Sequence, residues 1–293
     1  MNVQIKTQDM VGLTKAAPLS RRGFMTASAA TAAGYTLAAG PVRADAIKTD
    51  TQGLTAGDTK VGVAGAEMPV YYARPAGVAN PPVILVAQEI FGLHEYIKDV
   101  TRRLAKLGAF AVAPDYYFRK GDLTKIADIQ ALFPIVNGKP ETELFADLDA
   151  TVAWAKSQGG NTDKLGIIGF CRGGRTVWRY STHNPGLKAG VAYYGPVSDA
   201  PSEAQAASAI AAVKDIKEPV LGLYGAEDQG IPVNDVNAMK AAMAAAGKTG
   251  EFKIYPGAPH GFHADYRPSY RQDAATDGWA QMTAWFKKYG VLS

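Results

Sequence analysis

The stretch that decides the fold is Leu165-Gly166-Ile167-Ile168-Gly169-Phe170-Cys171-Arg172-Gly173-Gly174. Its first five residues are apolar or glycine, as expected of a strand that is buried on both faces. A helical pattern runs from residue 172 to about 180. Glycines at 169 and 173 leave room for a sharp turn in which the residue between them is strained and its side chain lies at the sheet edge. The sequence therefore predicts a strand, a tight turn and a helix, with Cys171 at the turn.

This turn has the pattern G-x-C-x-G, which in a strand-turn-helix context is typical of the nucleophile elbow of α/β-hydrolases, with cysteine in place of serine. The amino end of the following helix carries partial positive charge and would favour the thiolate form of Cys171. A free cysteine is more often a small buried apolar residue, but this context favours a catalytic one. Because the chain has a single cysteine, it can form no intrachain disulfide and offers no cysteine cluster for structural zinc, so we expect no metal site.

Strand and helix patterns alternate along the rest of the chain. Apolar or alternating runs predict strands at residues 68–74, 83–87, 109–113, 165–169, 189–194, 220–224 and 252–255. Helical patterns occupy residues 97–107, 144–155, 172–180, 235–246 and 279–289. This alternation predicts an α/β fold of the α/β-hydrolase type, with a mostly parallel central sheet flanked by helices on both faces, in one domain over residues 47–293. Residues 123–140 fit the alternation least well and could form an excursion over the active site.

Two polar residues follow later predicted strands in the order that an elbow requires, which is nucleophile, acid and histidine. Asp228 lies in a Gly-rich loop after the strand at 220–224, and His260 lies in a Pro-rich turn after the strand at 252–255. His260 would accept the thiol proton, and Asp228 would fix the tautomer of the imidazole. Glu227 and His263 are the weaker alternatives. The two other histidines, at 94 and 183, lie off the predicted triad.

Five short motifs follow one another between residues 70 and 285. They are Q-E-I-F-G at 88–92, A-P-D-Y-Y at 113–117, G-F-C-x-G-G at 169–174, G-x-x-D at 225–228 and H-G-F at 260–262. In this order they resemble the dienelactone hydrolase (carboxymethylenebutenolidase) family. The resemblance implies a cofactor-independent hydrolase that cleaves a small lactone or ester through an acyl-thioester on Cys171. It also implies that Glu89 contacts the cysteine and helps to generate the thiolate, and that the backbone N–H groups of Ile90 and Arg172 form the oxyanion hole.

The resemblance is less complete for substrate binding. Family members that act on dienelactone hold its carboxylate with two arginines, and the first corresponds to Arg119. The second is expected four residues beyond the histidine, where this sequence has Ala264, and the nearest arginine is Arg267. Either Arg267 reaches the site from a differently shaped loop, or the substrate is not an anionic lactone. The alternatives are a general carboxylesterase of other small acyl substrates, a non-catalytic small-molecule binding protein on a hydrolase scaffold, and a redox role for the thiol.

The amino-terminal residues have the layout of an export signal. Paired arginines at 21 and 22 precede an Ala-rich apolar run at 27–40, and Ala44-Asp45-Ala46 follows it. This layout is typical of a twin-arginine signal peptide, here residues 1–46, and implies contact with the twin-arginine export machinery and a bacterial periplasmic destination. The run is short for a membrane span, so we expect no stable membrane insertion; an uncleaved anchor and a cytoplasmic tail are the alternatives.

Charge gives little indication of a macromolecular partner. The formal net charge is +4, and the basic residues are scattered among acidic ones along the chain. Without a basic cluster, nucleic-acid binding has no support. We therefore expect a monomer that binds a small lactone or ester and no nucleic acid.

Overall fold

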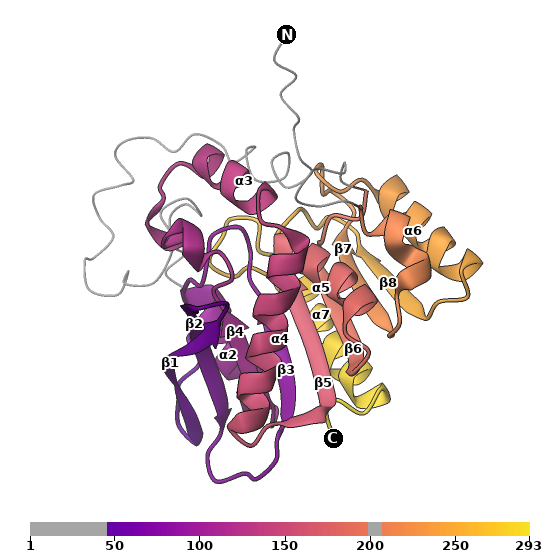
Figure 1. Ribbon diagram of the computed structural model, residues 1–293. Helices are drawn as coiled ribbons and strands as arrows, with labels where there is room; N and C mark the ends of the chain where they lie inside the picture. The colour runs from indigo at the N-terminus through magenta and orange to yellow at the C-terminus, as the bar shows by residue number, and fades with distance from the viewer. Residues whose placement is uncertain (1–45, 199–206) are drawn as a thin grey trace.

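One eight-stranded sheet organises the computed structural model, which describes residues 46–198 and 207–293 (Figure 1). Its strands are β1 (Leu54–Val63), β2 (Ala66–Pro75), β3 (Pro82–Ala87), β4 (Phe110–Pro114), β5 (Asn161–Phe170), β6 (Leu187–Tyr193), β7 (Val220–Gly225) and β8 (Gly250–Tyr255). Their order across the sheet is β1-β2-β4-β3-β5-β6-β7-β8. From β4 to β8 every neighbouring pair is parallel, whereas β2 is antiparallel to both β1 and β4. The predicted α/β-hydrolase fold with a mostly parallel sheet is confirmed.

Helices cover both faces of this sheet. They are α2 (Glu95–Lys106), α3 (Ile129–Asn137), α4 (Glu141–Ser157), α5 (Arg172–His183), α6 (Val233–Ala245) and α7 (Gln272–Lys288), with short 3-10 turns η2 (Phe118–Lys120), η3 (Leu123–Lys125) and η4 (Ile210–Asp215). In Figure 1, α4 and α5 lie in front of the sheet and α7 lies behind it. The central strands are therefore enclosed, and residues 165–170 at the end of β5 are all buried. Burial of each Val, Leu or Ile side chain stabilises such a core by about 1.5–3 kcal/mol.

Strand β1 is a feature that the sequence analysis did not predict. It forms a hairpin with β2, in which Val63 pairs with Ala66 across the two residues Ala64 and Gly65. Both turn residues have positive φ, 49° and 77°, as a two-residue type I′ turn requires. The half-exposed sequence of β1 contains glycines, threonines and an aspartate, which weakens its strand signal.

Two further segments differ from the prediction in extent. Residues 123–140, which fit the strand and helix alternation least well, form η3 and the short helix α3. Helix α7 begins at Gln272, well before the predicted residue 279. The prediction missed its first turns because they are polar and show no apolar periodicity. Only small residues, Ala275 and Gly278, are buried in that part of α7.

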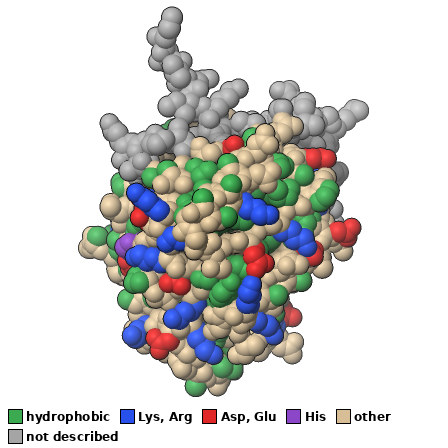
Figure 2. Space-filling view, turned by 90° about the vertical axis from the view of Figure 1, so that its right-hand side faces the viewer, with side chains coloured by type: hydrophobic (Ala, Val, Ile, Leu, Met, Phe, Trp, Pro, Cys, Tyr) green, Lys and Arg blue, Asp and Glu red, His purple; other side chains and the backbone are tan. Residues whose placement is uncertain are grey.

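The predicted signal peptide lies outside the described residues except for Ala46, which is their first residue. Across 46–198 and 207–293, none of the helices has both the length and the apolar character to span a membrane. On the face shown in Figure 2, Lys and Arg side chains are interspersed with acidic and apolar ones.

Candidate active site

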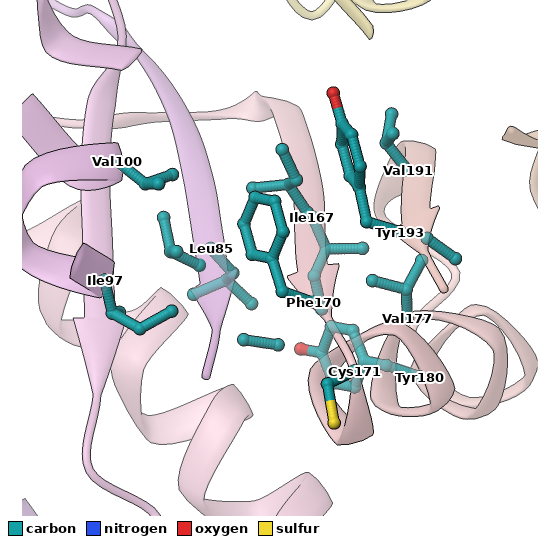
Figure 3. Close-up of a cluster of buried hydrophobic side chains, with 14 of the residues drawn as sticks. Leu85, Ile97, Val100, Ile167, Phe170, Cys171, Val177, Tyr180, Val191 and Tyr193 are labelled. Atoms are coloured by element: carbon teal, nitrogen blue, oxygen red, sulfur yellow. The ribbon is translucent and has the colours of Figure 1, made fainter. Parts of the chain in front are cut away.

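The turn between β5 and α5 holds Cys171 in a strained backbone conformation, with φ 54° and ψ −122°. Such a conformation costs of order 1–3 kcal/mol and persists only where the surrounding structure enforces it. Here the Cys171 N–H donates to the Tyr193 carbonyl over 3.1 Å, and the Cys171 carbonyl accepts from the Gly174 N–H over 2.9 Å. Figure 3 shows Phe170 turned into the apolar core, whereas the Cys171 sulfur points away from it. The structure thus forms the turn that the sequence predicts.

Two glycines let three backbone segments meet at this turn. A Cβ atom on Gly169 would lie 2.1 Å from the Gly173 carbonyl oxygen, and one on Gly173 would lie 2.1 Å from the Ala87 carbonyl oxygen. Any larger residue would push α5 away from the ends of β3 and β5. The first turn of α5 therefore packs directly against the end of β3, which places Cys171 close to the loop that carries Glu89.

The predicted acid and histidine come together at the carboxyl ends of β7 and β8. His260 Nδ1 lies 2.7 Å from Asp228 Oδ2, and both side chains are buried. The other oxygen of Asp228 accepts hydrogen bonds from the N–H groups of Gly230 and Ile231 over 2.9 and 3.1 Å. The carboxylate is therefore fixed at both oxygens and holds the imidazole in one orientation. Glu227, the alternative acid, is exposed.

Tyr194 connects this pair with the cysteine. It follows β6 directly, has a positive φ of 38°, and its ring centroid lies 5.1 Å from that of His260. Burial, together with the nearby Glu89 and Cys171, raises the pKa of its hydroxyl well above the usual value. The Tyr194 ring thus lies against His260, and its hydroxyl is within the electrostatic reach of Glu89 and Cys171.

Glu89 lies in the loop after β3 as a fully buried carboxylate. The Tyr266 hydroxyl donates to its Oε2 over 2.9 Å, and His94 Nε2 lies 3.2 Å from the same oxygen. Burial alone would raise the pKa of Glu89, but His94, the charge of Arg267 and the Tyr266 hydroxyl together hold it below the usual value. Glu89 is therefore ionised at neutral pH. Its Oε1 has no hydrogen-bond partner among the described residues.

The two predicted substrate arginines have different surroundings. Arg267 is buried with its guanidinium carbon 5.6 Å from the centre of the Phe91 ring. Burial opposes its charge, but Tyr266, Glu89 and Cys171 hold its pKa above the usual value, so Arg267 lies in their electrostatic reach. Its backbone N–H donates to the Ala264 carbonyl over 3.0 Å. The chain thus makes a turn between Ala264 and Arg267, and the arginine is buried next to Phe91.

Arg119 is bound instead to helix α4. Its guanidinium donates to Asp147 over 2.9 and 3.0 Å and to Glu143 over 3.1 Å. Lys139 contacts the same two carboxylates. The described structure gives Arg119 two acidic partners rather than a place beside Glu89, and its contact with substrate stays a prediction.

The two predicted oxyanion donors come from different segments: Arg172 follows the cysteine in the chain, and Ile90 lies in the loop after β3. Arg172 is the first residue of α5, so its N–H belongs to the amino end of that helix. Ile90 is buried next to Glu89, and within residues 46–198 and 207–293 its N–H makes no hydrogen bond. Both amides are suited to an oxyanion, and their role stays a prediction.

Sequence reasoning missed His94 and Tyr266 as members of this site. His94 lies off the triad, as predicted, but it contacts Glu89. Its only signal in the sequence is its position five residues after Glu89 at the start of α2, and Tyr266 has none. The other two histidines lie elsewhere: His263 Nδ1 lies 2.7 Å from the Tyr96 hydroxyl, and burial lowers its pKa well below the usual value, whereas His183 contacts Asp149.

No cluster of three or more His, Cys, Asp or Glu side chains suited to a metal ion is found in the part of the chain that the structure describes. The candidate site is thus made of a strained cysteine, an Asp–His pair, a buried glutamate and a buried arginine.

Comparison with known proteins agrees with this arrangement. Residues 68–290 match the Dienelactone hydrolase family. A "Putative carboxymethylenebutenolidase" of Methylorubrum extorquens is 49% identical over 286 residues, which cover 97% of this chain and 98% of that protein. A protein of the same name from Escherichia coli K12 is 44% identical over 259 residues, covering 88% and 96%. A crystal structure titled "Putative Dienelactone Hydrolase" from Klebsiella pneumoniae superposes with a TM-score of 0.79 at 45% identity and covers 80% of this chain and 99% of that chain.

Proposed function

The chain belongs to the dienelactone hydrolase family and is a hydrolase that acts on ester or lactone bonds, and from this premise we propose that Cys171 is its nucleophile. One observation carries the proposal. Cys171 is strained at an elbow, φ 54°, in a chain whose following acid and histidine form a buried pair 2.7 Å apart. Strain at a single nucleophilic residue beside an oriented imidazole is what covalent acyl transfer requires.

The proposed cycle has two halves and uses only side chains and water. In the first half the thiol proton passes to Glu89, and the thiolate adds to the substrate carbonyl carbon. The acyl C–O bond then breaks, the departing oxygen takes up the proton, and an acyl-thioester remains on Cys171. In the second half His260, oriented by Asp228, takes a proton from water. The hydroxide adds to the thioester carbonyl carbon, the C–S bond breaks, the departing sulfur takes the proton back from His260, and the carboxylic acid leaves.

We propose a small lactone with a carboxylate, such as dienelactone, as the substrate. Arg267 supports this assignment, because its buried guanidinium is within the electrostatic reach of Cys171 and Glu89 and its Nη1 has no hydrogen-bond partner among the described residues. A buried guanidinium nitrogen without a partner is costly, and a carboxylate would satisfy it.

A general carboxylesterase of other small acyl substrates is the second candidate. The observation that favours it is the position of Arg119, whose guanidinium is already bound by Asp147 and Glu143. A site that has one available arginine instead of two would hold an anionic substrate less firmly.

The nucleophile is tested with Cys171→Ala and Cys171→Ser on chromogenic esters and lactones. We expect Cys171→Ala to lose more than about 10³-fold in kcat, and the wild-type protein to show the mass of an acyl adduct on its single cysteine during turnover. Undiminished turnover by Cys171→Ala would refute the assignment.

The substrate class is tested with paired anionic and neutral lactones on the wild-type protein, Arg267→Ala and Arg119→Ala. For an anionic substrate, Arg267→Ala should raise KM for the charged lactones alone, and Arg119→Ala serves as the matched arginine control. If the wild-type protein prefers neutral substrates and neither variant changes that preference, the esterase assignment replaces the lactone.

We also propose export to the bacterial periplasm by the twin-arginine machinery, without stable membrane insertion, as a monomer that binds no nucleic acid. The paired arginines at 21 and 22 and the Ala-rich run that follows support export. Mass spectrometry of the periplasmic protein should find a new amino terminus near residue 46, and Met1 retained there would contradict export. Gel filtration of the mature protein tests the monomer.

A further inference from the structure

The surroundings of Glu89 contain more unpaired polar atoms than a buried region normally tolerates. Among the described residues, Glu89 Oε1, His94 Nδ1 and Arg267 Nη1 are buried without a hydrogen-bond partner. Each such group costs about 1–3 kcal/mol, and native proteins keep few of them. Their concentration around Glu89 indicates a function rather than a packing defect.

The His94 ring is held firmly in its place. His94 is the N-cap residue of α2, and its backbone N–H donates to the Gly92 carbonyl over 3.0 Å. The ring centroids of Tyr266, Tyr96 and Phe91 lie 5.3, 6.0 and 6.0 Å away. Side chain and backbone together thus fix the imidazole with Nε2 next to Glu89.

The contact between His94 and Glu89 also has a direction, with the imidazole as donor and the carboxylate as acceptor. His94 Nε2 lies 3.2 Å from Glu89 Oε2, the oxygen that also accepts from Tyr266. A neutral imidazole with its proton on Nε2 leaves only a bare lone pair at the unpartnered Nδ1, which is the less costly tautomer for a buried ring. Both neighbours therefore present hydrogens to the same carboxylate oxygen, and Oε1 remains for another donor.

Other groups around Glu89 share this environment. The titratable and charged ones are His94 and Tyr96 from the start of α2, Tyr266 and Arg267 from the loop before α7, and Tyr194 and Cys171 from the ends of β6 and β5. Arg267 and Tyr194 each interact with both Glu89 and Cys171. The carboxylate and the thiol thus lie in one neighbourhood.

We propose that His94 is a positioning residue that holds Glu89 through Oε2, so that the ionised carboxylate keeps Oε1 available for the thiol proton of Cys171. The inference rests on the proposed function, because it assumes that Cys171 is the nucleophile. In the step itself the S–H bond breaks, the proton moves to Glu89 Oε1, and the electron pair stays on sulfur. His94 does not touch the reacting atoms.

The test measures thiolate formation directly, because the chain has a single cysteine. Iodoacetamide alkylation of Cys171 is followed by intact mass from pH 5 to 9 in wild type, His94→Phe and His94→Gln. Phe keeps the ring without nitrogen, whereas Gln can restore one N–H donor. His183→Gln, at a partly exposed histidine whose imidazole contacts Asp149 and Phe145 of α4, serves as the control.

When the His94 donor is removed, the pKa of the Glu89 carboxyl should rise. A larger share of Glu89 is then protonated at mildly acidic pH and cannot accept the thiol proton. We expect His94→Phe to alkylate about tenfold more slowly than wild type at pH 6, with the difference closing by pH 9. Its kcat should fall about 10- to 100-fold with KM nearly unchanged. His94→Gln should recover most of both rates.

A double mutant separates positioning from packing. In a Glu89→Gln background, His94→Phe should cause no further loss of alkylation rate, since the carboxylate it positions is gone. A folded His94→Phe with the wild-type pH profile, or an equal loss in both backgrounds, would overturn the proposal. If Cys171→Ala retains activity, the nucleophile assignment fails; if it is inactive while His94→Phe keeps the wild-type profile, only the role of His94 fails.

Discussion

Two buried acid–imidazole pairs, His260 with Asp228 and His94 with Glu89, belong to the candidate site, and they are built differently. Asp228 accepts hydrogen bonds at both oxygens, with His260 2.7 Å from one and two backbone N–H groups on the other. Glu89 has neighbours at one oxygen only, with His94 at 3.2 Å and Tyr266 at 2.9 Å. Both oxygens of Asp228 accept hydrogen bonds, so we call the pair Asp228–His260 saturated. Glu89 Oε1 has no partner among the described residues, so we call the pair Glu89–His94 incomplete.

The difference teaches how one site can use the same residue types for two purposes. A saturated carboxylate fixes the tautomer and direction of its imidazole and has no reason to change its contacts. An ionised carboxylate with an unpaired oxygen is prepared to accept a proton or a hydrogen bond. Variants that remove single groups from either pair test this contrast.

The saturated pair should be the more sensitive one. Asp228→Asn keeps the shape of the side chain but presents a neutral amide to the imidazole, which favours the wrong tautomer. We expect kcat to fall about 10³- to 10⁴-fold with the fold intact, measured on the best chromogenic substrate. Glu227→Gln is the matched control at the exposed neighbour, and equal losses in both variants would contradict the assignment of Asp228.

Glu89→Gln should cost less, because hydroxide can still deprotonate the thiol at high pH. We expect about a 100-fold loss of kcat at pH 7 that becomes smaller towards pH 9. The pH–rate profile checks this, and a loss that stays constant across the pH range would speak against a role of Glu89 in proton acceptance.

Asp115, directly after β4, is another buried carboxylate. Its ionisation is expected to affect the free energy of unfolding, which adds a measurement of stability to the comparison. Burial raises its pKa to about 6, although Gln88 and the Tyr117 N–H donate to it. Because the folded-state pKa exceeds the unfolded value, Asp115 lowers the free energy of unfolding above pH 6 and not below about pH 4. We expect Asp115→Asn to stabilise by about 1–3 kcal/mol at pH 7.5 and by nearly nothing at pH 4. Urea denaturation at both pH values measures this, and an equal gain at both would exclude the charge as its cause.

The smallest effect is expected for Tyr266→Phe, which removes one of two neighbours from Glu89 Oε2. The loss of this hydrogen bond should slow Cys171 alkylation at pH 6 roughly fivefold, about 1 kcal/mol. Tyr255→Phe is a suitable control, since its hydroxyl donates to Asp277 on the partly exposed surface over 2.7 Å. Identical rates for the two variants would mean that Tyr266 does not help to hold Glu89.

The residues of the saturated pair could be predicted from chain order, whereas around Glu89 only that residue and Arg267 were predicted, with the help of the family resemblance, and His94 and Tyr266 were not. Cys171 and Asp228 follow strongly apolar strands and His260 follows a short alternating one, and the carboxyl ends of parallel strands meet at one edge of a sheet. Chain order and local motif were therefore sufficient to place them.

Contacts between loops that lie far apart in the chain leave no such pattern in the sequence. Tyr266 reaches Glu89 across 177 positions of the chain, and only the packing of two loops decides that contact. Likewise, Arg119 is bound to α4 because two acids on one helix face point towards it, which no spacing near Arg119 reveals. Strand β1 escaped prediction because its polar and glycine residues weaken the local strand signal, although Ala64 and Gly65 mark the turn that follows it.

The backbone contacts at Gly169 and Gly173 also limit how this enzyme can evolve. Both positions lie where any side-chain carbon would overlap a neighbouring carbonyl oxygen, so substitution there disrupts the corner that carries the cysteine before it can alter specificity. New substrate preferences are expected to arise in the loops after β3 and β8, at positions other than Glu89 and His260, because loops tolerate change around an unchanged corner. A library for directed evolution gains most from diversity in those loops and should leave both glycines untouched.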